Sequence, residues 1–423
     1  MKGLSEKNKN ILIISYFFPP MGLGGVQRAA KTAKYLALMG WNVFVLTSDY
    51  NSYPVKDFSL LEDIADSIRI TRITDPLADS ANPDRADNYI TPGRSNFWRR
   101  MTRLPDAKIF WSSKIKDIAE KIVSENKIEY LLTTSPPPSL HGVGVYLRNK
   151  FQLRWLADFR DPWLADDLPD ITPVHSYLRS KLENDIIKSA DNVSVVTTTH
   201  QHNLQSRFPD YSNKIVYIPN GYDPQDFAEK VSSEPDKIVL THCGTLCSKF
   251  SVMAFFETLT AALSKNEKLR DEIKFVQIGN VNEEIYQELD HSYSSLLSIE
   301  YTGYLGHKNA VRKTQQSSAV VVFSGISPTL ELNLPGKLYE ALASDRPCLA
   351  VFKKHSPARE ILAQMPGVFL LDPDDIESSA DILQKFIEQY QTGALEQISR
   401  KSLLAKYSRE KQTEQIARLL ENR

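Results

Sequence analysis

Short runs of β-branched and other apolar residues alternate with longer stretches of helical periodicity along the chain. The first series of apolar runs predicts strands at residues 11–16, 43–47, 68–73, 130–134, 155–159, 193–197 and 215–219. A second series predicts strands at residues 238–242, 274–278, 299–302, 320–323, 348–351 and 368–371. The intervening stretches, such as 27–39, 111–125, 252–263 and 338–343, predict helices. Because apolar strands separated by helices are typical of parallel sheets covered on both faces, each series predicts one doubly wound α/β domain.

A charged, turn-rich segment without apolar periodicity, residues 218–237, separates the two series. We therefore expect an N-terminal domain at 1–222, a hinge at about 223–236 and a C-terminal domain at 237–404. The last residues predict an amphipathic helix with Ile416, Leu419 and Leu420 on one stripe. Ligands of open α/β sheets bind outside the carboxyl ends of the strands, so two such domains predict a site in a cleft between them.

Composition narrows the function classes. At 423 residues the chain is too long for one core, which agrees with two domains. A net charge of −1 gives no general attraction to nucleic acid. The three cysteines fit a reducing compartment, and their spacing predicts neither a disulfide framework nor a metal site. The polar start and the lack of an 18-residue apolar run predict a cytoplasmic protein, with room for contact with the inner face of a membrane.

The most informative stretch is 331–347, where a loop runs directly into an apolar-periodic helix. Pro335 suits the first turn of a helix, and Gly336 lets a ligand approach the backbone closely. The free N–H groups of such a start and the helix dipole favour an anion. Glu340 follows one turn later, where its carboxylate can accept from two neighbouring hydroxyls. Anion and diol together indicate a nucleotide diphosphate carrying a ribose.

Glycine-rich loops follow the first predicted strand of each domain. Gly24 and Gly25 permit close approach to a phosphate or sugar, although a tight strand-to-helix turn explains them as well. Their spacing differs from GxGxxG, and Asp49 lies just past the second strand, which disfavours a dinucleotide fold. In the second domain, Gly244-Thr245 forms the turn and Lys249 is expected just before the next helix, where it meets a pyrophosphate or is simply solvated.

Charged residues cluster where the strand at 155–159 ends, in Asp158, Arg160 and Asp161, followed by Trp163. Buried charge is costly unless it is paired or used, so the cluster is either a salt bridge closing the loop or a sugar-facing site. The proline-rich segment 133–144 is either a rigid connection or part of this site.

Two further segments have open interpretations. After the strand at 299–302, the backbone near Tyr304 and Leu305 can read a base edge, and His307 is either part of this loop's function or a surface histidine. Basic and aromatic residues at 95–111 suit an anionic membrane surface, or a helix that covers the first domain; RNA binding fits less well because no basic stripe continues beyond them.

In this order the motifs resemble those of the GT-B-fold glycosyltransferases, in particular the retaining family 4 group of bacterial polysaccharide enzymes and a branch with a DFRDPW signature, here 158–163. The resemblance runs from the first glycine loop through TTSPPPSLHGVG, ADNVSVVTTT and IPNGYDPQDF to LPGKLYEALASDRP. It implies the GT-B fold, two Rossmann-like parallel-sheet domains facing a central cleft, with the donor on the second domain and the acceptor on the first. It also implies that no metal or other cofactor is needed, and that the helix at 407–423 packs back on the first domain.

The resemblance assigns roles residue by residue. Lys249 matches the phosphate-binding basic residue, and Glu340 matches the second glutamate of an E-x7-E motif, the ribose ligand. The first glutamate of that motif falls on Leu332, with Glu331 one residue away, and Arg160-Asp161 stands where many members have His-Asp. The implied catalytic residues are Arg160, Asp161 and Lys249. The implied donor residues are Gly24, Gly25, Gly244, Thr245, Lys249, Tyr304, Leu305, Glu331, Leu334, Pro335, Gly336, Lys337, Leu338 and Glu340, and the acceptor-side residues are Ser135, His141, Asp158 and Trp163.

We therefore expect a retaining glycosyltransferase that moves a sugar from a nucleotide diphosphate to a saccharide or lipid-linked acceptor, in cell-surface polysaccharide synthesis. Its partners are then the nucleotide sugar, the acceptor and, through 95–111, a membrane surface, but no nucleic acid. Two alternatives are a sugar-nucleotide epimerase of the same fold, and a catalytically silent subunit that binds a sugar or a partner enzyme. The leucine at 332 favours the silent subunit.

Overall fold

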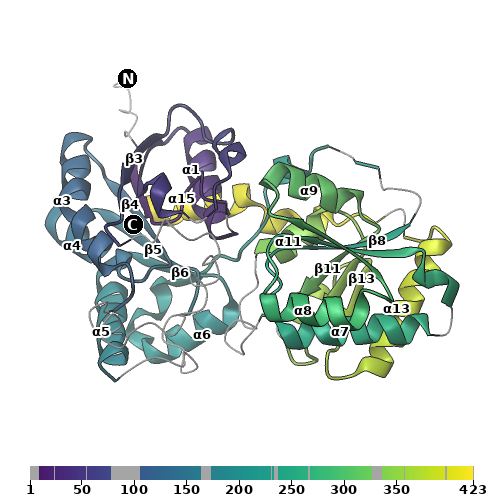
Figure 1. Cartoon of the computed structure of the whole chain (residues 1–423). Helices are drawn as coiled ribbons and strands as arrows, with labels where there is room; N and C mark the ends of the chain where they lie inside the picture. The colour runs from purple at the N-terminus through teal and green to yellow at the C-terminus, as the bar shows by residue number, and fades with distance from the viewer. Residues whose placement is uncertain are drawn as a thin grey trace. The chain divides into compact units, whose positions relative to one another are not determined.

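The computed structural model describes residues 9–22, 24–53, 55–77, 105–162, 173–229, 231–232, 237–264, 267–325, 336–356, 358–395 and 398–422. The chain divides into two compact units, which are coloured along the sequence in Figure 1. Unit 1 contains Met1–Pro219 and Arg409–Arg423, and unit 2 contains Asn220–Ser408.

Unit 1 is built on a seven-stranded parallel sheet with the order β3-β2-β1-β4-β5-β6-β7. Its strands are β1 (Asn10–Ser15), β2 (Asn42–Ser48), β3 (Arg69–Ile73), β4 (Tyr130–Ser135), β5 (Arg154–Phe159), β6 (Asn192–Val195) and β7 (Ile215–Tyr217). Its helices are η1 (Gly24–Val26), α1 (Gln27–Leu38), η2 (Tyr50–Ser52), η3 (Phe58–Leu61), α3 (Ile109–Glu125), α4 (Leu140–Phe151), α5 (Pro173–Ser189), α6 (Thr198–Arg207), η5 (Pro209–Lys214) and α15 (Arg409–Glu421).

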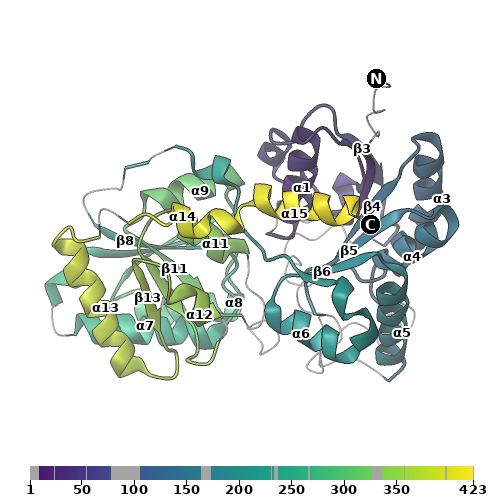
Figure 2. The same cartoon turned by 180° about the vertical axis from the view of Figure 1, so that it is seen from behind.

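Each face of this sheet has its own apolar core, because successive strand side chains point to opposite faces. In β1, Leu12 and Ile14 pack with helices α3, α4 and α5, whereas Ile11 and Ile13 pack with α1 and α15. Helix α15 lies beside α1 although nearly four hundred residues separate them in the sequence (Figure 2). Its buried Ile416 and Leu420 join the core of the α1 face.

Unit 2 is built on a six-stranded parallel sheet with the order β10-β9-β8-β11-β12-β13. Its strands are β8 (Ile238–Cys243), β9 (Ile273–Ile278), β10 (Ser298–Gly303), β11 (Ala319–Phe323), β12 (Cys348–Val351) and β13 (Val368–Leu371). Its helices are η6 (Pro224–Phe227), α7 (Lys249–Leu263), η7 (Glu267–Arg270), α8 (Glu283–Tyr293), α9 (His307–Gln316), α11 (Gly336–Ala343), α12 (Ala358–Leu362), α13 (Ile376–Gln391), α14 (Lys401–Leu404) and η8 (Ala405–Tyr407). Helices α7, α8 and α13 cover one face, and α9, α11 and α12 cover the other (Figure 1).

The predicted fold class is confirmed: both apolar series form parallel sheets between helix layers, with all the predicted strands in place. Strand bounds differ from the predicted ones by one or two residues at most. The start of α7 differs more, because the helix begins at Lys249 instead of after it. Lys249 is therefore the first helical residue and not a loop residue.

Candidate functional site

Each sheet has a topological switch point, which its strand order defines. At this point two neighbouring strands lead to helices on opposite faces of the sheet. In unit 2 this point lies between β8 and β11. In open α/β sheets, ligands bind outside the carboxyl ends of the strands at such a point. The turn after β8 contains Gly244 and Thr245, and the next described helix after β11 is α11. The predicted donor residues that lie in the described part of unit 2 therefore gather mainly at this edge.

Lys337 and Gly244 are in close contact at the switch point. Gly244 has φ of +148°, a conformation that favours glycine, and a Cβ built on it would overlap Nζ of Lys337 and lie 3.0 Å from its Cδ. The carbonyl of Gly244 is fixed by Nε2 of the buried Gln277, at 2.6 Å. The first turn of α11 thus places a half-buried ammonium group directly on the Gly-Thr turn. A cation beside open helix N–H groups is suited to a phosphate.

Glu340 lies one turn after Lys337 on the same helix, and both residues line a small cavity of about 40 Å³. Its other polar lining groups include His242, Cys243 and His307. Burial, with the charge of Lys337 as a smaller cause, lowers the pKa of His242 to about 4, so this imidazole is neutral at pH 7. The cavity marks where polar groups of β8, α9 and α11 converge.

The ion pairs of Lys249 are formed with another helix, α8. Its Nζ is 2.8 Å from Glu284 Oε1 and 3.5 Å from Glu288 Oε2, both on α8. Its side chain is 43% exposed, and the hydrogen bond that its ammonium donates to Glu284 raises the pKa of Lys249. Lys337, which contacts the Gly-Thr turn, is therefore better placed than Lys249 to meet a diphosphate at the switch point.

The loop after β10 is held by contacts on both sides. Leu305 packs against the apolar cluster of Val239, Ile278 and Ala310, while Tyr304 is exposed. His307, the first residue of α9, forms a 3.0 Å contact through Nε2 with Asp226 Oδ2 in η6. His307 is thus a partly buried structural contact of this loop and not a surface histidine.

In unit 1 the switch point lies between β1 and β4, and Arg160 connects the end of β4 with η1, which follows β1. Its Nε donates to the carbonyl of Ser135 at 2.6 Å, and its Nη1 donates to the carbonyl of Gly25. A Cβ on Gly25 would lie 3.3 Å from Nη2 of Arg160, so glycine allows this approach. Because Arg160 is only 9% exposed and donates to these two carbonyls, it stabilises the backbone around Gly25 and Ser135. The neighbouring Gly24 is exposed.

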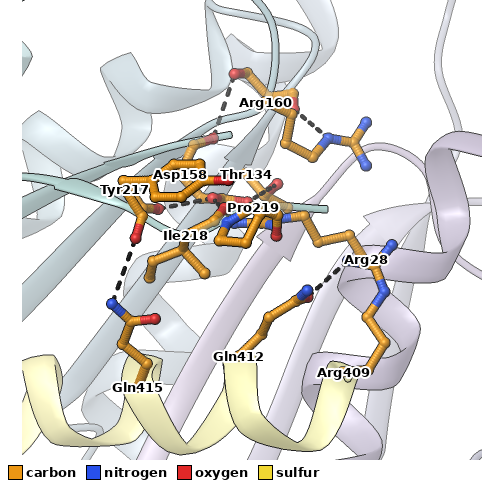
Figure 3. Close-up of polar contacts among 12 residues, drawn as sticks. Arg28, Thr134, Asp158, Arg160, Tyr217, Ile218, Pro219, Arg409, Gln412 and Gln415 are labelled. Carbon is orange, nitrogen blue, oxygen red and sulfur yellow. Dashed lines mark hydrogen bonds and ion pairs between the residues drawn. The ribbon is translucent and has the colours of Figure 1, made fainter. Parts of the chain in front are cut away.

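Asp158, expected on the acceptor side, is buried inside unit 1. Its carboxylate is 2% exposed and forms a bidentate pair with Arg28, with Nη2–Oδ1 at 2.7 Å and Nε–Oδ2 at 2.9 Å (Figure 3). Thr134 and Ser194 donate to the same carboxylate at 2.9 and 2.7 Å. Although burial opposes it, this set of donors holds the pKa of Asp158 at about 2. Asp158 therefore belongs to an ion pair, and its partner is Arg28 of α1, outside the charged cluster at 158–161.

His141 also lies inside unit 1, in contrast to its expected acceptor-side position. The ring is fully buried, and Nδ1 lies 2.7 Å from Thr133 Oγ1, which also accepts from Trp155 Nε1. Burial lowers the pKa of His141 to about 3, so it is neutral at pH 7. Ser135 is buried as well, and its hydroxyl donates to the carbonyl of Asp158. Of the charged cluster after β5, Asp161 is an exposed residue, although burial of its carboxyl by the surrounding atoms raises its pKa.

Four of the predicted site residues, Trp163, Glu331, Leu334 and Pro335, lie outside the described residues. Sequence reasoning missed Arg28 and Asp226. The signal for Arg28 was a charged residue on the apolar face of α1, where Ala29, Ala30 and Ala33 are buried around it. No comparable signal marks Asp226, whose role depends on the placement of His307 in three dimensions.

Within the described ranges, no group of three His, Cys, Asp or Glu side chains is arranged to hold a metal ion. Among the helices described, none combines the length and the apolar character needed to cross a membrane. Of the predicted membrane segment, only 105–111 is described.

Comparison with known proteins agrees with the fold. Residues 237–389 match the family model described as "Glycosyl transferases group 1". No curated protein sequence matches the chain. Among solved structures, the chain is similar to a sucrose-phosphate synthase from Thermosynechococcus elongatus, with 16% identity, 97% of this chain and 98% of that one covered, and a TM-score of 0.66.

Two more solved structures share the fold at similar distance. WaaG, a glycosyltransferase involved in lipopolysaccharide biosynthesis, has 12% identity, with 98% and 100% of the two chains covered and a TM-score of 0.62. A structure described as trehalose-6-phosphate from E. coli bound with UDP-2-fluoro glucose has 13% identity, with 97% and 99% covered and a TM-score of 0.63. At these identities the likeness shows the GT-B fold of the chain and nothing finer.

Proposed function

We propose that this protein is a glycosyltransferase that moves a sugar from a nucleotide diphosphate donor to a saccharide or lipid-linked acceptor. The observation that carries the proposal is the pairing of Lys337 with the Gly244 turn at the switch point of unit 2, with Glu340 one turn further along α11. This site lies within the range that matches the glycosyl transferases group 1 model. The structure solved with UDP-2-fluoro glucose supports a nucleotide sugar as the donor.

Each group of the proposed donor site has a defined task. Lys337 and the first N–H groups of α11 neutralise the diphosphate, and the stabilisation grows as the phosphate leaves with its negative charge. Glu340 accepts from the two ribose hydroxyls. Thr245 and the backbone at Tyr304 and Leu305 complete the contacts to phosphate and base. Lys249 is assigned no direct contact with the donor, because its ammonium is engaged with Glu284 and Glu288.

We further propose retention of configuration by front-face substitution, as the resemblance to family 4 implies. The bond between the anomeric carbon and the diphosphate oxygen breaks, and the acceptor oxygen bonds to the same face of that carbon. The leaving phosphate takes the proton of the acceptor hydroxyl, so no metal and no protein base is required. Asp161, exposed at the end of β5, is the candidate group for orienting the acceptor in unit 1.

The acceptor is proposed to belong to cell-surface polysaccharide synthesis, in line with the lipopolysaccharide role stated for WaaG. A peripheral contact of 95–111 with the inner face of the membrane remains part of this proposal. In the described part of that segment, Phe110 is 46% exposed, as an aromatic contact with a lipid surface requires.

The test is a screen of labelled nucleotide sugars with the purified full chain, with and without a membrane extract as a source of acceptor. Transfer of label to a saccharide or lipid product supports the proposal. Release or epimerisation of the donor sugar alone points to the epimerase. Binding of a nucleotide sugar without transfer or turnover indicates the silent subunit, which is the second candidate because Leu332 stands where the resemblance expects a glutamate.

A further inference from the structure

The buried ion pair of Arg28 and Asp158 does more than neutralise two charges. Arg28 is 3% exposed and is the second residue of α1, one turn after the Gly24-Gly25 loop. Besides its bidentate contact with Asp158, Nη1 donates to the carbonyl of Pro219 at 2.8 Å and Nη2 donates to the carbonyl of Ile218 at 3.2 Å. These two carbonyls belong to the last residues of unit 1 before the chain enters unit 2.

The returning chain is fixed at the same place. After Ser408 the chain re-enters unit 1 as α15, and Gln415 of this helix donates through Nε2 to the carbonyl of Tyr217 at 3.4 Å. Arg409, at the start of α15, donates through Nη1 to Gln412 Oε1 at 3.0 Å, and both side chains are buried. Figure 3 shows α15 passing beside Tyr217, Ile218 and Pro219, and Arg28 donates both to this segment and to Asp158.

The other end of the network reaches the glycine loop. Asp158 is the last residue but one of β5, and Arg160 follows directly after the strand. Arg160 donates to the carbonyls of Gly25 and Ser135. Starting at Gly25, the contacts run through Arg160 and the end of β5 to Asp158, then through Arg28 and back along α1. The glycine loop and the exit of the chain from unit 1 are thus attached to one rigid frame.

We propose that Arg28 is a positioning residue for the transfer reaction, holding the exit segment 217–219 in a fixed relation to the Gly24-Gly25 loop. The proposal rests on the proposed function, because the resemblance to the GT-B glycosyltransferases assigns Gly24 and Gly25 to the donor site. If the ion pair only stabilised unit 1, the contact between Arg28 and the carboxylate of Asp158 would be sufficient. In addition, Arg28 donates to the backbone carbonyls of Ile218 and Pro219 in the exit segment. The single ammonium group of a lysine cannot form all of these contacts at once.

The experiment compares Arg28→Lys with a control that removes an ion pair elsewhere in unit 1. Arg207→Met provides the control, because Arg207 pairs with the buried Glu183 and has no contact in this network. Three quantities are measured for each variant: kcat and KM for transfer, the affinity for the free nucleotide diphosphate, and amide hydrogen exchange of peptides covering 214–224. The nucleotide site lies in unit 2, so its affinity reports whether the donor site is intact.

For Arg28→Lys we expect kcat to fall on the order of 10- to 100-fold, because small misplacements of reacting groups have effects of this size. Nucleotide affinity should stay unchanged, and exchange at Ile218 and Tyr222 should become faster. Arg207→Met should lower thermal stability while leaving kcat and the exchange of 214–224 at wild-type values. Wild-type kcat in Arg28→Lys, or an equal loss of kcat in Arg207→Met, would overturn the proposal.

A double variant separates positioning from stability. Arg28→Met leaves Asp158 as an unpaired buried charge, whereas Arg28→Met with Asp158→Asn removes both charges. We expect the double variant to recover thermal stability relative to Arg28→Met, and to keep the low kcat and the fast exchange at 214–224. Recovery of kcat together with stability would show a purely structural pair. If the wild-type chain transfers no sugar at all, the proposed function fails, and the exchange of 214–224 still decides whether Arg28 fixes the exit segment.

Discussion

Lys249 and Lys337 are the two candidates for binding the diphosphate in unit 2. Replacing each of them in turn by methionine shows which one binds it. Methionine keeps the apolar stem of Lys337 over Gly244 and removes only the ammonium group. A hydrogen bond to a charged group contributes about 1.5–3 kcal/mol, which corresponds to an affinity loss of about 10- to 150-fold for a nucleotide diphosphate. For Lys249→Met we expect no comparable loss, since the exposed ammonium already pairs with Glu284 and Glu288.

The assay is titration calorimetry of the free nucleotide diphosphate into the wild-type chain and both variants at one fixed salt concentration, because screening weakens ion pairing. Thermal unfolding of each variant serves as the control for intact structure. A loss of affinity in Lys249→Met that equals or exceeds the loss in Lys337→Met would refute the placement of the diphosphate at the Gly244 turn. It would instead restore the role that the sequence resemblance gives to Lys249.

Three further predictions concern the same structure. Gly244→Ala should weaken nucleotide diphosphate binding at least as strongly as Lys337→Met, because the added Cβ displaces Lys337, whereas Gly40→Ala, at φ of +81° with open space around it, should not; calorimetry on both variants checks this. Glu340→Leu should abolish the difference in affinity between a nucleotide diphosphate and its 2′,3′-dideoxy analogue, because leucine cannot accept from a hydroxyl, and a difference that persists in the variant argues against a ribose contact. Unit 1 should lose stability as the pH falls from about 6.5 to 4, because burial lowers the pKa of His141 to about 3 and that of His200 to about 4, so the unfolded chain binds more protons in this range, at about 1.4 kcal/mol per pH unit for each histidine. All five tryptophans belong to unit 1, so denaturant unfolding followed by tryptophan fluorescence at pH 7.5 and 5.0 measures this loss, and equal stability at both values contradicts it.

The elements of the fold were predictable because each strand is an apolar run in a parallel sheet. In such a sheet both faces are buried, so runs like 11–14 and 348–351 stand out from their polar flanks. The C-terminal helix was predictable from its apolar stripe, and Ile416 and Leu420 are indeed buried. The start of α7 was not, and its N-cap residue, Ser248, forms no capping hydrogen bond through its side chain.

The candidate site was predictable in its chain positions and not in its contacts. Gly244 and Gly336 could be recognised from sequence because their roles depend on the local backbone. The choice between Lys249 and Lys337 could not, since it depends on which side chain reaches Gly244 after β8 and β11 become neighbours in the sheet. Likewise the partner of Asp158 is Arg28, 130 residues earlier, and no local pattern joins the two.

The three charged residues at the end of β5 have different roles. Asp158 accepts hydrogen bonds from Arg28, Thr134 and Ser194, so its charge is compensated inside unit 1 and its carboxylate has no acceptor position left for a ligand. The guanidinium of Arg160 donates to the backbone carbonyls of Gly25 and Ser135. These contacts hold the two backbone segments together and keep the cation away from the surface. Asp161 is then the exposed acidic residue of the cluster. Because the first two residues set the backbone from which Asp161 projects, their replacement should change how the acceptor is oriented without either of them touching it.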